Sequence, residues 1–216
     1  MDLTTFQAMT QTIVDGDKDK AAVLAGEVLA GGGDPQEAIE KGFVPGIQKV
    51  GLLWESGDFF LPELLAGAEA MKAAMAVLHP ALGAGRAAAL SAGRVVIGTV
   101  EGDIHDIGKN LVSALLSANG FAVVDLGADV KVERFISAAE ESGATIIGLS
   151  ALLTTTMLGQ RRLVEELRQR GLRDKYKVLV GGAPVTRRWA DEIGADGYGE
   201  NALAAVRAAK ALAGRA

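Results

Sequence analysis

The chain has no cysteine and only two histidines among its 216 residues. Without thiols it cannot form a disulfide, a thiolate zinc site, an iron–sulfur cluster or a cysteine nucleophile. A transition-metal site would have to use His79, His105 or carboxylates, and the chain cannot build a multi-histidine site by itself.

Long apolar runs and clusters of basic residues are also missing. No apolar run approaches the ~18 residues that a membrane helix needs, and the first residues lack the basic flank and apolar stretch of a signal peptide. Acidic residues outnumber basic ones, 27 against 22, and Lys and Arg form no block that would suit a phosphate backbone. We therefore expect a soluble, cytoplasmic protein that binds neither membrane nor nucleic acid.

The first part of the chain, residues 1–80, carries apolar positions at helical spacing and almost no strand signal. It predicts a four-helix bundle, with helices over 3–14, 21–30, from Asp34 to about Leu53, and 62–78. Pro45 lies inside the third helix, so we expect a kink there. Residues 81–93 are rich in Ala, Gly, Ser and Arg and predict a linker.

From residue 94 to 216 the pattern changes to short apolar strands that alternate with helices. Strands are predicted over 95–100, 122–126, 145–149 and 177–180, and helices over 107–118, 132–141, 156–170, 186–193 and 201–212. This order predicts a doubly wound α/β domain, Rossmann-like or flavodoxin-like, with a parallel sheet covered on both faces. Ligands of such sheets bind beyond the carboxyl ends of the strands, here after Val100, Leu149 and Val180.

Unusual residues follow all three of these strands, in the segments 101–110, 150–156 and 181–184. The glycines of the first segment fit neither a phosphate loop nor a dinucleotide fingerprint. The neighbours of His105 alone allow three interpretations. In the first, its imidazole forms only a hydrogen bond at a helix start. In the second, it binds a metal while Asp103 accepts its other N–H, and in the third it is a catalytic base whose hydroxyl nucleophile comes from Ser150 or the threonines 154–156.

The three segments together resemble a known family. Asp103-x-His105-x-x-Gly108, then Ser150-x-Leu152 and later Gly181-Gly182, are similar to the signature of cobalamin-binding domains of methionine synthase and of methyltransferase corrinoid proteins. The segment Trp54 to Leu65 is similar to the helical cap of these proteins. The resemblance covers essentially the whole chain.

The resemblance implies roles for individual residues. His105 would be the lower axial ligand of cobalt, because the corrin ring supplies four further nitrogens. Asp103 would accept a hydrogen bond from His105 and continue it to the hydroxyl of Thr156, where methionine synthase has serine. The cofactor would be cobalamin, as methylcobalamin, cob(I)alamin or a related corrinoid. Its contacts would come from ten further residues of the α/β domain: Gly102, Ile104, Asp106, Ile107, Gly108, Ser150, Leu152, Thr154, Gly181 and Gly182.

Glycines would leave room for the nucleotide tail of the cofactor, although Gly181-Gly182 also suits a tight strand-to-helix turn. On the helical cap, Trp54 and Leu61 match positions that shield the upper face of the corrin, and Glu40 matches a carboxylate that touches the cofactor. For isolated aromatic residues on a helix, core packing is the common alternative. His79 precedes Pro80 at a helix end, where capping or surface exposure is the simpler role.

By this resemblance the chain is a non-catalytic methyl carrier that binds cobalamin base-off/His-on. One substrate-specific methyltransferase would methylate the cobalt, and a second would pass the methyl group to tetrahydrofolate or coenzyme M, with a reductive activator as a further partner. The linker would act as the hinge of the cap. Two alternatives stay open: a cobalamin-dependent sensor that regulates transcription or signalling, and a receiver-like or flavodoxin-like domain without a corrinoid.

Overall fold

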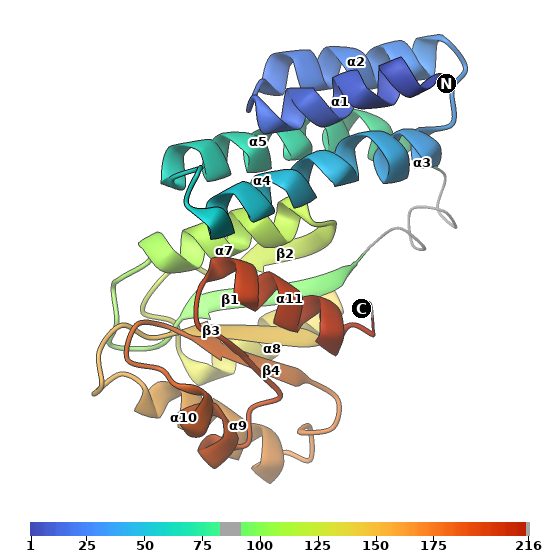
Figure 1. Ribbon diagram of the computed structural model, residues 1–216. Helices are drawn as coiled ribbons and strands as arrows, with labels where there is room; N and C mark the ends of the chain where they lie inside the picture. The colour runs from blue at the N-terminus through green and yellow to red at the C-terminus, as the bar shows by residue number, and fades with distance from the viewer. Residues whose placement is uncertain (83–91, 215–216) are drawn as a thin grey trace. The chain divides into compact units, whose positions relative to one another are not determined.

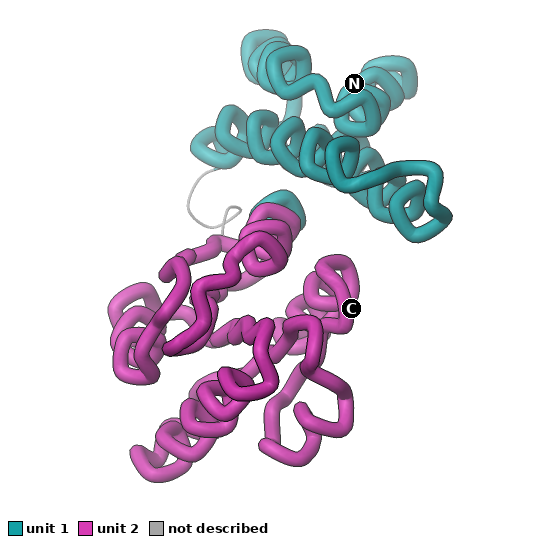
Figure 2. Tube along the Cα trace, turned by 90° about the vertical axis from the view of Figure 1, so that its left-hand side faces the viewer, with its two compact units in different colours: residues 1–91, 117–120 teal, residues 92–116, 121–216 magenta. Residues whose placement is uncertain are grey.

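The computed structural model describes residues 1–82 and 92–214. The chain divides into two compact units, an N-terminal unit of residues 1–91 with 117–120 and a C-terminal unit of residues 92–116 with 121–216 (Figure 2). Most of the predicted linker, residues 83–91, lies outside the described residues. None of the described helices is long and apolar enough to cross a membrane.

The N-terminal unit is helical, as predicted. Aspartates begin its first three helices, because Asp2, Asp17 and Asp34 each accept a hydrogen bond from a backbone N–H of the first turn. The helical elements of the unit are α1 (Leu3–Val14), α2 (Lys18–Ala30), α3 (Pro35–Glu37), the π-helical η1 (Ala38–Phe43), α4 (Val44–Ser56), α5 (Leu61–Leu78) and the 3₁₀-helical η2 (His79–Leu82).

The third predicted helix is π-helical over η1, directly before Pro45, and the kink expected near this residue stays a prediction. Pro45 has no N–H to donate to the preceding turn, and it lies in the first turn of α4, directly after η1. Gly46 then brings α4 close to α1, since a Cβ atom at this position would lie 2.7 Å from the Ile13 Cβ. Met9, Ile13 and Phe43 are completely buried in this helical core.

The C-terminal unit is a five-stranded parallel sheet with the order β2-β1-β3-β4-β5. The doubly wound prediction is therefore confirmed, with one strand more than the sequence indicated. The missed strand, β5 (Gly197–Gly199), has only three residues, and its glycines give no apolar or β-branched signal. The other strands are β1 (Gly93–Thr99), β2 (Phe121–Asp125), β3 (Ile146–Ser150) and β4 (Lys177–Gly181).

Helices cover both faces of the sheet, with α7 and α11 on one face and α8, α9 and α10 on the other (Figure 1). Their bounds are α7 (Ile107–Ala118), α8 (Val132–Ser142), α9 (Leu158–Gln169), α10 (Arg187–Ile193) and α11 (Ala202–Leu212). Alternate strand residues such as Val96, Ile147 and Val180 belong to the buried apolar cluster with α8, α9 and α10. The intervening residues point to the face of α7 and α11.

The register of the sheet places the ends of three strands side by side. Thr99 of β1 pairs with Ser150 of β3, and Ser150 pairs with Gly181 of β4. The segments that follow these strands therefore begin at the same edge of the sheet, as the sequence predicted. This edge is where a ligand would bind in an open α/β sheet.

An ion pair with one buried partner, Lys109, links the start of α7 to the end of β2. The Lys109 ammonium lies 2.6 Å from both carboxylate oxygens of Asp125, and the Lys109 side chain is 2 % exposed, whereas Asp125 is 32 % exposed. Asp125 also accepts the backbone N–H of Gly127 at 2.8 Å. The pair therefore links the helix that follows His105 to the neighbouring strand.

The unequal burial predicts unequal effects of breaking this pair. Asp125→Ala leaves an ammonium group buried without its counter-ion, so we expect a loss of about 3 kcal/mol in the free energy of unfolding. Lys109→Met leaves a carboxylate that water can reach, and we expect a loss of about 1 kcal/mol. Urea unfolding of both variants measures the difference. Equal losses in the free energy of unfolding would contradict the larger penalty expected for the unpaired ammonium.

Candidate functional site

The loop after β1 is organised around the carboxylate of Asp103, which is completely buried. One carboxylate oxygen, Oδ1, lies 2.8 Å from Nδ1 of His105 and accepts the His105 backbone N–H at 3.1 Å. The other oxygen, Oδ2, accepts the Thr156 hydroxyl at 2.7 Å and the Leu152 backbone N–H at 2.7 Å. The structure therefore brings together the three residues predicted to form a relay.

These hydrogen bonds determine the charge of Asp103. Burial by itself would raise the pKa of the carboxyl group, but donors from Thr156, Leu152 and His105 outweigh it and hold the pKa well below its usual range. At neutral pH Asp103 is therefore a carboxylate, which only accepts hydrogen bonds. The neutral His105 ring must then carry its proton on Nδ1, which leaves the lone pair on Nε2.

The His105 imidazole is fixed on one side and open on the other. Its side chain is 47 % exposed, and its backbone carbonyl accepts the Thr99 hydroxyl at 3.0 Å. Within residues 1–82 and 92–214, Nε2 has no hydrogen-bond partner, and no group of three His, Asp or Glu side chains could hold a metal ion. A metal at His105 would thus have to bring its other ligands, as the cobalt of a corrin ring does, so this donor set fits the predicted cofactor.

Apolar side chains face solvent next to His105. Ile104 and Ile107 are 78 % and 79 % exposed, and Leu152 and Leu153, whose backbone N–H groups donate to Asp103, are also exposed. Leu158, at the start of α9, is also exposed. Large exposed apolar residues in one region indicate a surface that is covered by a ligand or a partner.

A buried glutamine joins the strand ends at this edge. The Gln160 side chain is completely buried; its Nε2 donates to the carbonyls of Leu149 at 3.1 Å and Gly181 at 3.0 Å, and its Oε1 accepts the Trp189 indole N–H at 2.9 Å. It therefore ties β3 to β4 beside Ser150. Sequence reasoning missed this residue, although a polar side chain at the first position of the stripe Leu163, Val164 and Leu167 was a usable signal.

The predicted glycines differ in what surrounds them. A Cβ atom at Gly182, where φ is +126°, would lie 1.8 Å from the Ala151 carbonyl oxygen, so the fold itself requires glycine. At Gly181 the Cβ would lie 3.0 Å from the Gly199 carbonyl oxygen. Gly108, in contrast, has nothing within 4 Å of a Cβ position, and the described chain leaves space there.

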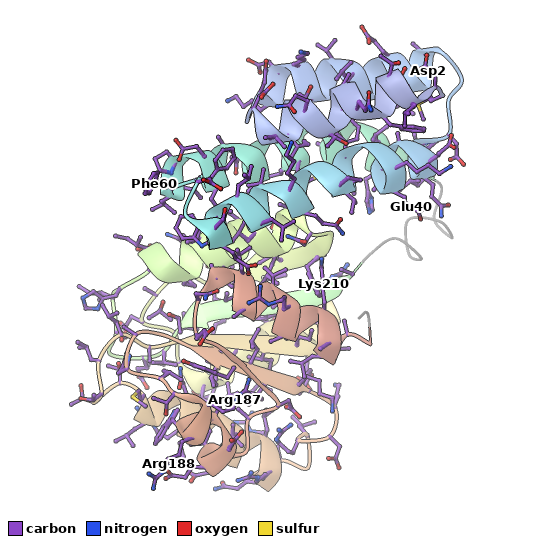
Figure 3. The ribbon with its side chains drawn as sticks, viewed as in Figure 1. Asp2, Glu40, Phe60, Arg187, Arg188 and Lys210 are labelled. Atoms are coloured by element: carbon purple, nitrogen blue, oxygen red, sulfur yellow. The ribbon has the colours of Figure 1, made fainter. Side chains whose placement is uncertain are left out.

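The residues predicted on the helical unit differ in their exposure, and one of them, Glu40, is labelled in Figure 3. Leu61, 38 % exposed, begins α5 next to Phe60, which is 68 % exposed. Trp54 in α4 is half-buried, and Glu40 in η1 is exposed and accepts a hydrogen bond from Gln36 at 3.0 Å. His79, the other histidine, is exposed at the start of η2.

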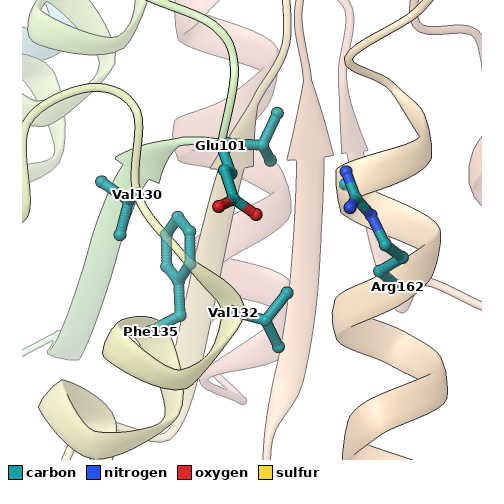
Figure 4. Close-up of a pocket in the computed structure, with 7 residues that line it drawn as sticks. Glu101, Val130, Val132, Phe135 and Arg162 are labelled. Carbon is teal, nitrogen blue, oxygen red and sulfur yellow. The ribbon is translucent and has the colours of Figure 1, made fainter.

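A small pocket lies between α8 and α9, on the face of the sheet that these helices cover (Figure 4). Glu101, Phe135 and Arg162 contribute to its lining. Neither His105 nor Ser150 lines it.

The two kinds of glycine predict opposite effects on the free chain. Gly182→Ala meets a backbone oxygen in a disfavoured conformation, and we expect a loss of about 3 kcal/mol in the free energy of unfolding. Gly108→Ala enters open space in the first turn of a helix, and we expect no loss and a gain of at most about 1 kcal/mol. Denaturant unfolding compares the two, and a destabilised Gly108→Ala would contradict the open space.

Comparison with known proteins agrees with this geometry. Two family descriptions, both of a B12 binding domain, match residues 93–207 and residues 5–79. A corrinoid protein of Desulfitobacterium hafniense is 47% identical over 216 residues, which is 100% of both chains. Trimethylamine corrinoid protein 1 of Methanosarcina acetivorans is 50% identical over 200 residues, 93% of this chain and 93% of that protein.

Solved structures give the same relationship. A cobalamin-binding protein from Desulfitobacterium hafniense has a TM-score of 0.76 and 36% identity, covering 94% of this chain and 95% of that chain. The methanol:cobalamin methyltransferase complex MtaBC from Methanosarcina barkeri has a TM-score of 0.85 and 31% identity, covering 99% of this chain and 81% of that chain. The chain therefore belongs to the B12-binding corrinoid protein family, and its cofactor is cobalamin.

Proposed function

We propose that this corrinoid protein is a methyl carrier between two methyltransferases. A substrate-specific methyltransferase transfers a methyl group to the bound cofactor, and a second methyltransferase passes it to tetrahydrofolate or coenzyme M. Relatives named trimethylamine and dimethylamine corrinoid proteins, 47% to 50% identical, support a methylamine as the methyl donor. The methanol:cobalamin methyltransferase complex among its structural relatives supports a methyltransferase partner.

The observation that carries this proposal is the state of His105. Its Nδ1 is held by the buried Asp103 carboxylate at 2.8 Å, and its Nε2 is free for a ligand. We infer that Nε2 replaces the cofactor's own base below the cobalt, in the base-off/His-on arrangement. When bound, cobalamin supplies a cobalt centre that accepts and releases a methyl group.

Asp103 and Thr156 tune this imidazole. The Asp103 carboxylate keeps the Nδ1 proton in place and makes the ring a better donor at Nε2. Thr156, buried and 2.7 Å from Oδ2, keeps the carboxylate oriented through its hydroxyl, and the methyl group that distinguishes it from serine does not prevent this bond.

The nucleotide tail is proposed to enter on the face of α7 and α11. In the row of Thr99, Ser150 and Gly181, Ser150 offers a hydroxyl and Gly181 a bare backbone there, and the free space at Gly108 is compatible with a ligand at this position. Ser150 and Thr154 would donate to the benzimidazole. Glycine at 182 needs no ligand to explain it, because Ala151 already requires it.

The remaining contacts follow the family resemblance. Gly102, Ile104, Asp106 and Ile107 lie in the loop of His105 or in the first turn of α7, and the exposure of Ile104 and Ile107 supports contact with the corrin. In the helical cap proposed for residues 1–80, Trp54, Leu61 and Glu40 are assigned to the upper face of the cofactor. The exposure of Leu61 supports its role.

The carrier role predicts the behaviour of His105→Ala. The wild-type chain, loaded with cobalamin, should show the absorbance spectrum of cobalamin ligated by protein histidine, and should take up about one methyl group per chain from a methylamine and its methyltransferase. The variant should lose the histidine-ligated spectrum and most of its methyl transfer, because the only other imidazole of the chain is His79, in the N-terminal unit.

His79→Ala is the matched control, since it removes the other histidine and should change neither measurement. An unchanged spectrum in His105→Ala would contradict the axial ligand. A wild-type chain with this spectrum that accepts no methyl group, from methylamines or from methanol, would contradict the carrier role alone.

The proposed tail site predicts selectivity between two corrinoids. Gly108→Leu places a large side chain in the open space, and we expect it to weaken binding of cobalamin at least about tenfold. Cobinamide, which lacks the nucleotide tail, should bind the variant and the wild type equally. Titration of the free chain with each corrinoid measures this difference, and equal weakening of both would contradict a tail at Gly108.

A further inference from the structure

Asp129, between β2 and α8, has an unusual backbone. Its φ is +56°, and it is the one non-glycine residue with a positive φ among residues 1–82 and 92–214. Side chains disfavour this left-handed region, and aspartate and asparagine tolerate it best. Asp129 is exposed, so packing of its side chain does not enforce the conformation. The conformation is therefore explained by the hydrogen bonds of Asp129 rather than by the packing of its side chain.

The contacts of Asp129 are with the loop that carries His105. Its side-chain Oδ1 accepts the backbone N–H of Gly102 at 2.7 Å, and its own backbone N–H donates to the carbonyl of Asp103 at 3.0 Å. Asp129 therefore binds both ends of the pair Gly102–Asp103. Gly102 itself has φ +83°, which leaves this part of the loop with little intrinsic preference for one conformation.

The next residue anchors Asp129 to the sheet. The Val130 N–H donates to the Thr99 carbonyl at 3.0 Å, and Val130 forms an isolated parallel bridge with Val100. The Thr99 hydroxyl in turn donates to the carbonyl of His105. The segment from Asp129 to Val130 is thus a rigid support for the backbone on which the Asp103 carboxylate and the His105 ring depend.

We propose that Asp129 is a positioning residue for His105, holding the Gly102–Asp103 backbone so that the carboxylate presents the imidazole Nε2 to the cobalt in one orientation. This inference rests on the proposed role of His105 as the axial ligand. Asp129 acts on the backbone of the loop. This action has two requirements: a side-chain oxygen that accepts the Gly102 N–H, and a left-handed backbone at residue 129.

Three substitutions separate these two requirements. Asp129→Asn keeps an oxygen acceptor and tolerates the left-handed backbone. Asp129→Gly keeps the conformation and loses the acceptor. Asp129→Ala loses both. Glu133→Ala is the matched control, because it removes a nearby exposed carboxylate, in the first turn of α8.

The readout is the electron paramagnetic resonance spectrum of the cobalt(II) form of each chain loaded with cobinamide. Cobinamide lacks the nucleotide base, so a splitting of the cobalt lines into triplets reports one nitrogen ligand from the protein. We expect the wild type, Asp129→Asn and Glu133→Ala to keep the triplets. In Asp129→Gly and Asp129→Ala we expect the equilibrium constant for histidine ligation to fall about tenfold. Thermal unfolding checks that each variant is folded. If Asp129→Ala does not fold, the spectrum of Asp129→Gly decides the result.

Full triplets in a folded Asp129→Gly would overturn the positioning role, and so would a loss in Asp129→Asn as large as in Asp129→Gly. His105→Ala distinguishes the two levels of the argument. Triplets that persist in His105→Ala would overturn the axial ligand and this inference with it, whereas their loss there, with no change in Asp129→Gly, would overturn this inference alone.

Discussion

The site depends on one buried carboxylate. Asp103 has no exposed surface, and its two oxygens accept from His105, Leu152 and Thr156, which come from two different loops at the edge of the sheet. A buried charge is tolerated only when donors surround it. The same bonds that keep Asp103 ionised therefore fix the tautomer of His105 and join the loop after β1 to the loop after β3.

The sequence was sufficient to predict this edge of the sheet. The carboxyl ends of parallel strands lie at one edge, so three motifs that are far apart in the sequence were expected to be neighbours there. It also predicted the pairing of Asp103 with His105 and, through family resemblance, with Thr156. It could not predict Asp129, whose importance lies in a backbone angle and in bonds to Gly102 and Asp103. The strand β5 was missed because glycines form most of it.

Two glycines of the same sequence signature have different structural causes. Gly182 fits the signature, yet the Ala151 carbonyl oxygen would exclude any side chain there in the absence of a ligand. At Gly108 the described chain leaves the position open. The fold therefore explains glycine at 182 and does not explain it at 108. The sequence alone does not distinguish the two positions, because they differ in their three-dimensional surroundings.

The exposed apolar residues near His105 have a consequence for the newly made polypeptide. Before loading, Ile104, Ile107 and Leu158 contact water, and such surfaces favour association with other chains. A ligand that covers them binds the folded form selectively and so stabilises it by mass action. The cofactor that gives the chain its chemistry would then also stabilise its folded form.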